Sequence, residues 1–152
     1  MATTYVVDAS VAIKYFITET YTPEVRVLVA QMYEGSHQLH IPEFCLIECV
    51  NVLWTNVRFR GLPQTDAEQM IVEMLALPFQ IVSVTSLLSR ALQIGLMHQL
   101  AIYDSMYIAL ALDMNCPLIT VDARQLNAAT AYGVAIKPIT DFASLGDRLM
   151  AQ

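Results

Sequence analysis

The chain has 152 residues, enough for one domain with a substantial core, and 56% of them are hydrophobic while 14% are charged. No apolar run approaches the roughly 20 residues that a membrane-spanning helix needs. The formal net charge of −6 argues against a nucleic-acid-binding protein that works through a basic surface. We therefore expect a single domain over residues 1–152, without membrane contact.

Short runs rich in β-branched and aromatic residues alternate with segments of helical period. In chain order we predict strand 4–7, helix 23–34, strand 38–41, helices 42–60 and 65–76, strand 79–84, helices 85–97 and 103–114, and strands 117–121 and 134–137. Pro42 is typical of a first helical turn, and Thr65 with Glu68 has the spacing of a capping box. Because no hairpin dipeptide such as Asn-Gly interrupts the alternation, we predict an α/β fold, a three-layer α/β/α sandwich with a central parallel sheet of about five strands.

Two predicted strands end on an aspartate. Asp8 follows the apolar run of YVVDAS, and Asp122 ends the run of LITVDAR. Ligands of open α/β sheets bind outside the carboxyl ends of the strands, where both residues are expected. Each aspartate is equally suited to cap the helix that follows it, because aspartate is a common N-cap. The sequence leaves both interpretations open.

Two further acids lie among the apolar residues of predicted helices. Glu48 is in the middle of PEFCLIECVNVLW, with Phe44 and Val52 four residues away on the same face. A carboxylate on such a face is costly to desolvate unless it is paired or bound to a cation. Asp104 precedes the core-like helix of IYDSMYIALAL, where a helix N-cap is the alternative.

Most of the other acids of the chain stand among polar residues. The four acids in apolar surroundings are therefore treated as one set, the site acids: Asp8, Glu48, Asp104 and Asp122. Carboxylates buried together without a matching lysine or arginine repel one another unless a cation joins them. Hard divalent cations prefer oxygen ligands, so Mg²⁺ or Mn²⁺ is the predicted ion. Zinc is disfavoured, because the cysteines and histidines do not complete a site of zinc-ligand spacing.

The motifs YVVDAS, the Glu48 helix, YDSMYIALA and LITVDAR resemble, in order and spacing, the acidic motifs of PIN-domain nucleases, and the resemblance covers nearly the whole chain. It is nearest to the small VapC-type toxins of bacterial toxin–antitoxin pairs. The resemblance implies a metal-dependent endoribonuclease that acts on single-stranded or structured RNA, with the site acids as metal ligands and catalytic residues. It also implies a small antitoxin protein as partner, and a homodimer. Ser10 and Thr120 match the supporting hydroxyls of the family, although a helix-capping or strand-end hydrogen bond explains each as well.

Few basic residues are available for substrate phosphates. The candidates are Lys14, one turn past Ser10, and Arg124, beside Asp122. A solvated surface role is the alternative for each of them. We therefore expect weak affinity for RNA or reliance on a groove between two subunits.

The odd number of cysteines, three, suits a reducing compartment, and the amino terminus lacks the basic region of a secretory signal, so we expect a cytoplasmic protein. The surplus of hydrophobic residues favours a subunit interface, which also supports a homodimer. Candidate contacts with a second subunit or an antitoxin, with ordinary core as the alternative, are Tyr15, Phe16, Met32 and Tyr33.

Other functions fit less well. Aspartyl-phosphate phosphatases need a second acid two residues after the first, where this chain has Ser10. A receiver-type phosphoacceptor needs paired acids at the first strand and a late lysine, and neither is evident. A non-catalytic or housekeeping metal-binding module that acts through a protein partner stays open as the alternative from another class.

Overall fold

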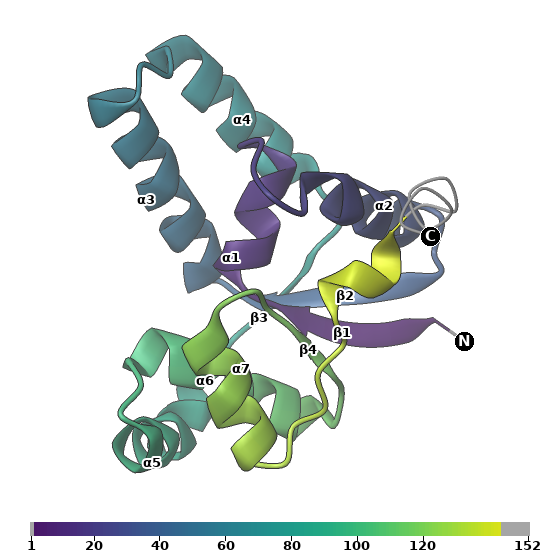
Figure 1. The fold of residues 1–152 in the computed structure, drawn as a ribbon, viewed down its shortest axis with the longest axis vertical. Coiled ribbons are helices and arrows are strands. Elements are labelled where there is room, and N and C mark those ends of the chain that lie inside the picture. The colour runs from purple at the N-terminus through teal and green to yellow at the C-terminus, as the bar shows by residue number, and fades with distance from the viewer. Residues whose placement is uncertain (1, 144–152) are drawn as a thin grey trace.

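The computed structural model describes residues 2–143, which form a parallel sheet with helices on both faces (Figure 1). The strands are β1 (Thr3–Val7), β2 (His37–Pro42), β3 (Gln80–Val82) and β4 (Leu118–Ile119). The α-helices are α1 (Ala9–Ala12), α2 (Thr22–Tyr33), α3 (Phe44–Phe59), α4 (Gln64–Ala76), α5 (Leu88–His98), α6 (Ile102–Met114) and α7 (Ala123–Ala131). The predicted three-layer α/β architecture is confirmed.

The sheet has four strands in the order β3-β2-β1-β4, and every pairing is parallel. The prediction of five strands is wrong, because residues 134–137 form only a single bridge, between Leu118 and Ile136. Strand β4 offers just two residues for pairing. Pro138 comes directly after the predicted strand 134–137 and has no N–H group with which to continue a ladder of hydrogen bonds.

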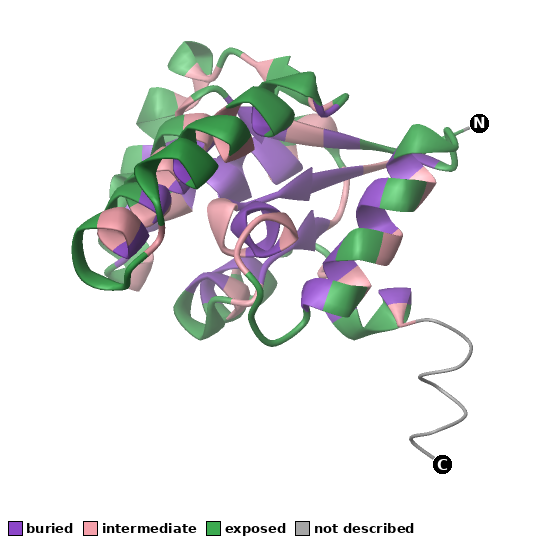
Figure 2. Ribbon diagram, turned by 90° about the horizontal axis from the view of Figure 1, so that it is seen from above, coloured by how far each residue is buried: buried purple, intermediate pink, exposed green. Residues whose placement is uncertain are grey.

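The layers follow from the hydrophobic pattern of the helices. Helix α6 is buried at every position from 105 to 111, which explains why its sequence is apolar all round, and it covers one face of the sheet. Helices α1 and α2 lie on the other face, and α3 and α4 run side by side as an arm that extends away from the sheet (Figure 1). Figure 2 shows much of the sheet buried between helices whose outer faces are exposed, although Gln80 and Ile81 of β3 are themselves exposed.

The two sequence signals that predicted helix starts act differently from the prediction. Pro42 pairs with Val82 as the last residue of β2, because the fixed φ of proline fits extended backbone as well as a first helical turn. Helix α4 begins after Pro63 without a side-chain cap, and the amide of Gln64 donates to Glu68 at 3.2 Å, so the capping box is wrong.

Most of the early-helix side chains that were predicted to contact a second subunit or an antitoxin are packed within the protein instead. Met32 is buried in the core, and Tyr15 and Phe16 are half-buried with their rings packed edge to face at 5.1 Å. Tyr33 is exposed. The exposed large hydrophobic side chains lie mainly on later helices and include Ile47, Trp54, Phe59, Val72, Leu75, Leu88, Leu92, Leu96, Met97 and Tyr103. None of the helices within residues 2–143 is long and apolar enough to cross a membrane.

Candidate active site

The strand order reverses between β1 and β4, and a ligand site of an open α/β sheet is expected at the carboxyl ends of these two strands. From β1 the chain continues to β2 and β3 on one side, and it returns to β4 on the other side of β1. Such a reversal of strand order separates the loops and helices that follow the two strands, which is where open α/β sheets bind ligands. Asp8 directly follows β1, and Thr120 directly follows β4.

Asp8 is 4% exposed and is held on both carboxylate oxygens. Its Oδ1 accepts from the Ser10 hydroxyl at 2.7 Å and from the Val11 N–H at 3.2 Å, and its Oδ2 lies 2.6 Å from Thr120 Oγ1. The Val11 bond makes Asp8 the N-cap of α1, so the capping interpretation is confirmed for this residue. Burial raises the pKa of the Asp8 carboxyl to about 6, against the opposing effect of these hydrogen bonds.

Thr120 connects Asp8 to a buried glutamine. Its Oγ1 also lies 2.8 Å from Gln125 Oε1 and accepts from the Asp122 N–H at 3.1 Å. The hydroxyl has one hydrogen, so it donates to Asp8 while that carboxylate is ionised and can turn to Gln125 when it is not. Gln125 is fully buried, and its amide donates to the backbone carbonyl of Asp104 at 2.9 Å.

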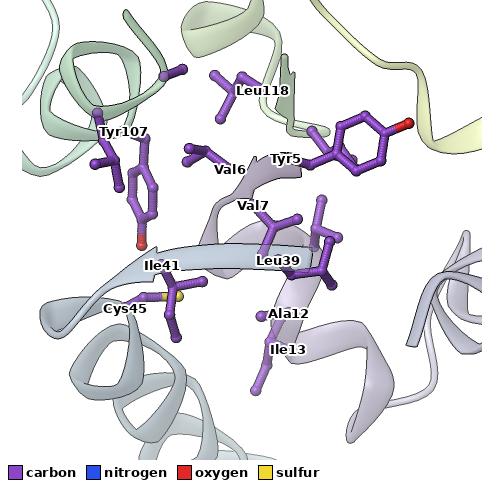
Figure 3. Close-up of a cluster of buried hydrophobic side chains, with 14 of the residues drawn as sticks. Tyr5, Val6, Val7, Ala12, Ile13, Leu39, Ile41, Cys45, Tyr107 and Leu118 are labelled. Atoms are coloured by element: carbon purple, nitrogen blue, oxygen red, sulfur yellow. The ribbon is translucent and has the colours of Figure 1, made fainter. Parts of the chain in front are cut away.

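Glu48 projects from α3 toward α6. The Tyr107 hydroxyl donates to Glu48 Oε1 at 2.6 Å, and Figure 3 shows the Tyr107 ring crossing the core toward α3 near Cys45. Burial raises the pKa of the half-buried Glu48, with the Tyr107 hydrogen bond opposing and the charge of Asp104 adding to the rise. Burial likewise raises the pKa of Tyr107, which therefore stays protonated as a donor at neutral pH.

Asp104 and Asp122 complete the set. Asp104 lies in the first turn of α6, whose N-cap is Ala101, so Asp104 is not a helix cap. Burial and then the charge of Asp122 raise the pKa of Asp104, and Arg124 lowers it. Asp122 is exposed and caps α7, with its Oδ1 accepting from the Gln125 N–H at 2.9 Å.

The site acids form an electrostatic series. The charge of Glu48 acts on Asp8, that of Asp104 acts on Glu48, and that of Asp122 acts on Asp104. Neither of the two salt bridges that residues 2–143 form involves a site acid. Three of the site acids are thus partly dehydrated, the fourth, Asp122, is exposed, and none of them has an ion-paired partner.

The donor chemistry of this set fits a hard divalent cation, since it supplies carboxylate oxygens and surplus negative charge. As the side chains stand, however, the described part of the chain has no group of three or more His, Cys, Asp or Glu residues placed to hold one ion. Asp8 and Glu48 instead accept hydrogen bonds from Ser10, Thr120 and Tyr107. The site acids are of the residue type that binds such an ion, and their charges act on one another, but their side chains do not together surround one ion.

The two candidates for phosphate contacts are engaged elsewhere. Lys14 is buried, and its ammonium forms a salt bridge of 2.9 Å with Glu19. Arg124 is exposed and donates to the backbone carbonyl of Gln99 at 2.8 Å, with its charge also acting on Asp104.

Sequence reasoning missed Gln125 and Tyr107. Gln125 follows Asp122 by three residues, which is the position whose N–H an N-cap accepts, but in the polar stretch DARQ nothing distinguishes a buried glutamine from a solvated one. Tyr107 follows Asp104 by three residues, on the adjacent turn of the same helix. That spacing was the available signal, yet an aromatic residue in an apolar helix is ordinarily core.

Comparisons with known proteins agree with this arrangement. A sequence model of the PIN domain matches residues 5–131. Ribonuclease VapC3 from Pyrobaculum aerophilum is 33% identical over 124 residues, which is 80% of this chain and 90% of that protein. The crystal structure of PAE2754 from Pyrobaculum aerophilum has a TM-score of 0.70 and 22% identity and covers 100% of both chains. A toxin–antitoxin complex from Klebsiella pneumoniae has a TM-score of 0.54 and 15% identity, covering 80% of this chain and 89% of that one. The chain belongs to the PIN domain family.

Proposed function

We propose that the protein is a metal-dependent endoribonuclease that hydrolyses phosphodiester bonds of RNA, and that it is the toxin of a toxin–antitoxin pair. The observation that carries the proposal is the series of site acids, which begins with Asp8 at the end of β1, with each acid within electrostatic reach of the next and none ion-paired. Identity to Ribonuclease VapC3 supports RNA as the substrate.

In this proposal Asp8, Glu48, Asp104 and Asp122 hold Mg²⁺ or Mn²⁺. Such an ion, when bound, lowers the pKa of water and stabilises the charge that develops on the phosphate. Ser10 and Thr120 orient the Asp8 carboxylate through the two hydroxyl contacts at 2.7 and 2.6 Å. Tyr107 fixes one oxygen of Glu48 and leaves the other free. No side chain is required as a nucleophile: the oxygen of a water molecule bonds to phosphorus and the P–O bond to the leaving ribose oxygen breaks. The water gives up a proton to solvent, and the leaving oxygen takes one up.

A cleavage assay tests the enzymatic part. Chelator-treated protein should not cleave an end-labelled single-stranded RNA, and adding Mn²⁺ should restore cleavage at internal positions. Asp8→Asn should be inactive with Mn²⁺, whereas Asp66→Asn, the same substitution at an exposed position of α4, should retain activity. Cleavage by Asp8→Asn at the wild-type rate, or none by the wild type with either ion, would contradict the proposal.

The biological part concerns partners. The similarity to a toxin–antitoxin complex supports a small antitoxin protein as partner, and the exposed hydrophobic side chains of the later helices support a homodimer. Expression of the wild type should arrest growth and that of Asp8→Asn should not. Normal growth with active enzyme would indicate a housekeeping nuclease instead. Light scattering that shows a monomer at high concentration would overturn the dimer.

A further inference from the structure

A cavity of about 520 Å³ opens beside the site acids, between α1, α3 and the start of α6. Glu48 and Ser10, which belong to the site, form part of its wall. Most of the remaining wall is apolar and includes Phe44, Ile47 and Tyr103. The cavity is therefore continuous with the proposed catalytic centre but differs from it in chemistry.

The aromatic part of this wall is exposed and anchored. Tyr103 is 61% exposed, and its ring contacts that of Phe44 with centroids 5.1 Å apart. Phe44 in turn packs against the buried Tyr107 at 5.3 Å. An exposed aromatic ring fixed from behind offers a flat face to a second ring at a low entropic cost.

The charges of the molecule bear on what can bind here. The net charge of −6 opposes the binding of RNA. Lys14 is in its salt bridge and Arg124 is on a backbone carbonyl, so these two residues supply little binding free energy through phosphates. Proteins that hold single-stranded nucleic acid can instead stack its bases on aromatic side chains, which contributes about 1–3 kcal/mol per base. A nucleobase is flat and uncharged, so it suits an apolar, aromatic wall next to carboxylates.

We propose that this cavity binds one nucleobase of the RNA substrate, next to the phosphate that is cleaved, stacked on Tyr103. Asn51 also borders the cavity and is exposed. Its amide presents both donors and an acceptor, the groups that read the edge of an unpaired base. This inference rests on the proposed function and adds to it a subsite that favours unpaired RNA and sets a base preference.

Binding of a short fluorescein-labelled single-stranded RNA, measured by anisotropy with Ca²⁺ in place of Mn²⁺, tests the subsite. Tyr103→Ala should weaken binding about tenfold to a hundredfold, and Tyr103→Phe should stay near the wild type, because phenylalanine keeps the stacking face. Tyr33→Ala, a substitution of an equally exposed tyrosine on α2 (59%), is the matched control and should have no effect. The dependence of affinity on salt should be shallow, since few cations contact phosphate.

Abasic substrates locate the base. Removing the one base that stacks should weaken binding to the wild type by the same factor as Tyr103→Ala, and should weaken binding to Tyr103→Ala no further. If Tyr103→Ala binds and cleaves RNA like the wild type, the inference is overturned while the proposed function stands. Loss of a protein partner in that variant, with unchanged RNA binding, would assign the cavity to a protein side chain. If the wild type neither binds nor cleaves RNA, the proposed function falls together with the subsite.

Discussion

Replacing Asp8 with asparagine removes a buried charge while keeping the hydrogen bonds around it. The Oδ1 contacts to Ser10 and Val11 persist with an amide oxygen in its place. The new Nδ2 donates to Thr120, whose hydrogen then turns to Gln125 Oε1, at 2.8 Å from the hydroxyl. Asparagine is as good an N-cap as aspartate, so α1 keeps its cap.

The expected gain in stability follows from the raised pKa of Asp8. Burial raises this pKa from 3.8 to about 6, and each pH unit corresponds to about 1.36 kcal/mol. Ionised Asp8 therefore destabilises the metal-free fold by about 3 kcal/mol above pH 6. Because the folded-state pKa is the higher one, this loss is absent below about pH 4 and develops as the pH rises to about 6.

Thermal melts in EDTA between pH 4 and pH 7.5 check the reasoning. At pH 7.5 the melting temperature of Asp8→Asn should exceed that of the wild type by roughly 6–12 °C, and the difference should shrink toward pH 4. Asp122→Asn, which changes the other N-cap at an exposed position, should shift stability by less than about 0.5 kcal/mol. A melting temperature of Asp8→Asn at or below that of the wild type at pH 7.5 would refute the account of a desolvated, uncompensated carboxylate.

Three further substitutions test other parts of the site. Asp104→Asn should abolish cleavage yet leave the metal-free protein at least as stable as the wild type. It should also reduce the stabilisation that Mn²⁺ gives, which in the wild type is about 2.7 kcal/mol at a hundredfold excess over the Kd. Equal metal-induced shifts in thermal melts of the two proteins would rule out Asp104 as a ligand. Tyr107→Phe should destabilise the protein by about 1.5–3 kcal/mol in urea unfolding and weaken Mn²⁺ binding, because Glu48 loses its donor; unchanged stability would argue against that bond. Gln125→Leu should lower kcat for RNA while leaving KM unchanged, since the backbone carbonyl of Asp104 loses its hydrogen-bond partner. The control Thr22→Val loses a buried hydrogen bond elsewhere and should lower stability without lowering kcat.

The parts of the fold that could be predicted from sequence are those set by local pattern. The strand–helix alternation predicted the parallel sheet, and α6 ends at Met114 as predicted, where Asn115 adopts a positive φ. The fifth strand failed because pairing depends on a neighbour that cannot be read locally. Strand β4 pairs over only two residues, so the apolar run 134–137 has little to pair with.

The candidate site was predictable where a residue contradicted its surroundings. Asp8 at the end of an apolar strand and Glu48 on an apolar helix face are such contradictions, and the charge of Glu48 acts on Asp8. The hydrogen bonds that hold them were not predictable, because Thr120 is 112 residues from Asp8 and Tyr107 is 59 residues from Glu48. Contacts of that separation follow from the sheet register and helix packing rather than from spacing.

Direct binding of Mn²⁺, followed by electron paramagnetic resonance as the free ion disappears, tests the central claim that the site acids share a cation. The wild type should bind Mn²⁺, Glu48→Gln should lose most of that binding, and Glu19→Gln, which removes an acid engaged by Lys14, should retain it. Wild-type protein that leaves Mn²⁺ free, or equal binding by Glu48→Gln, would contradict the account.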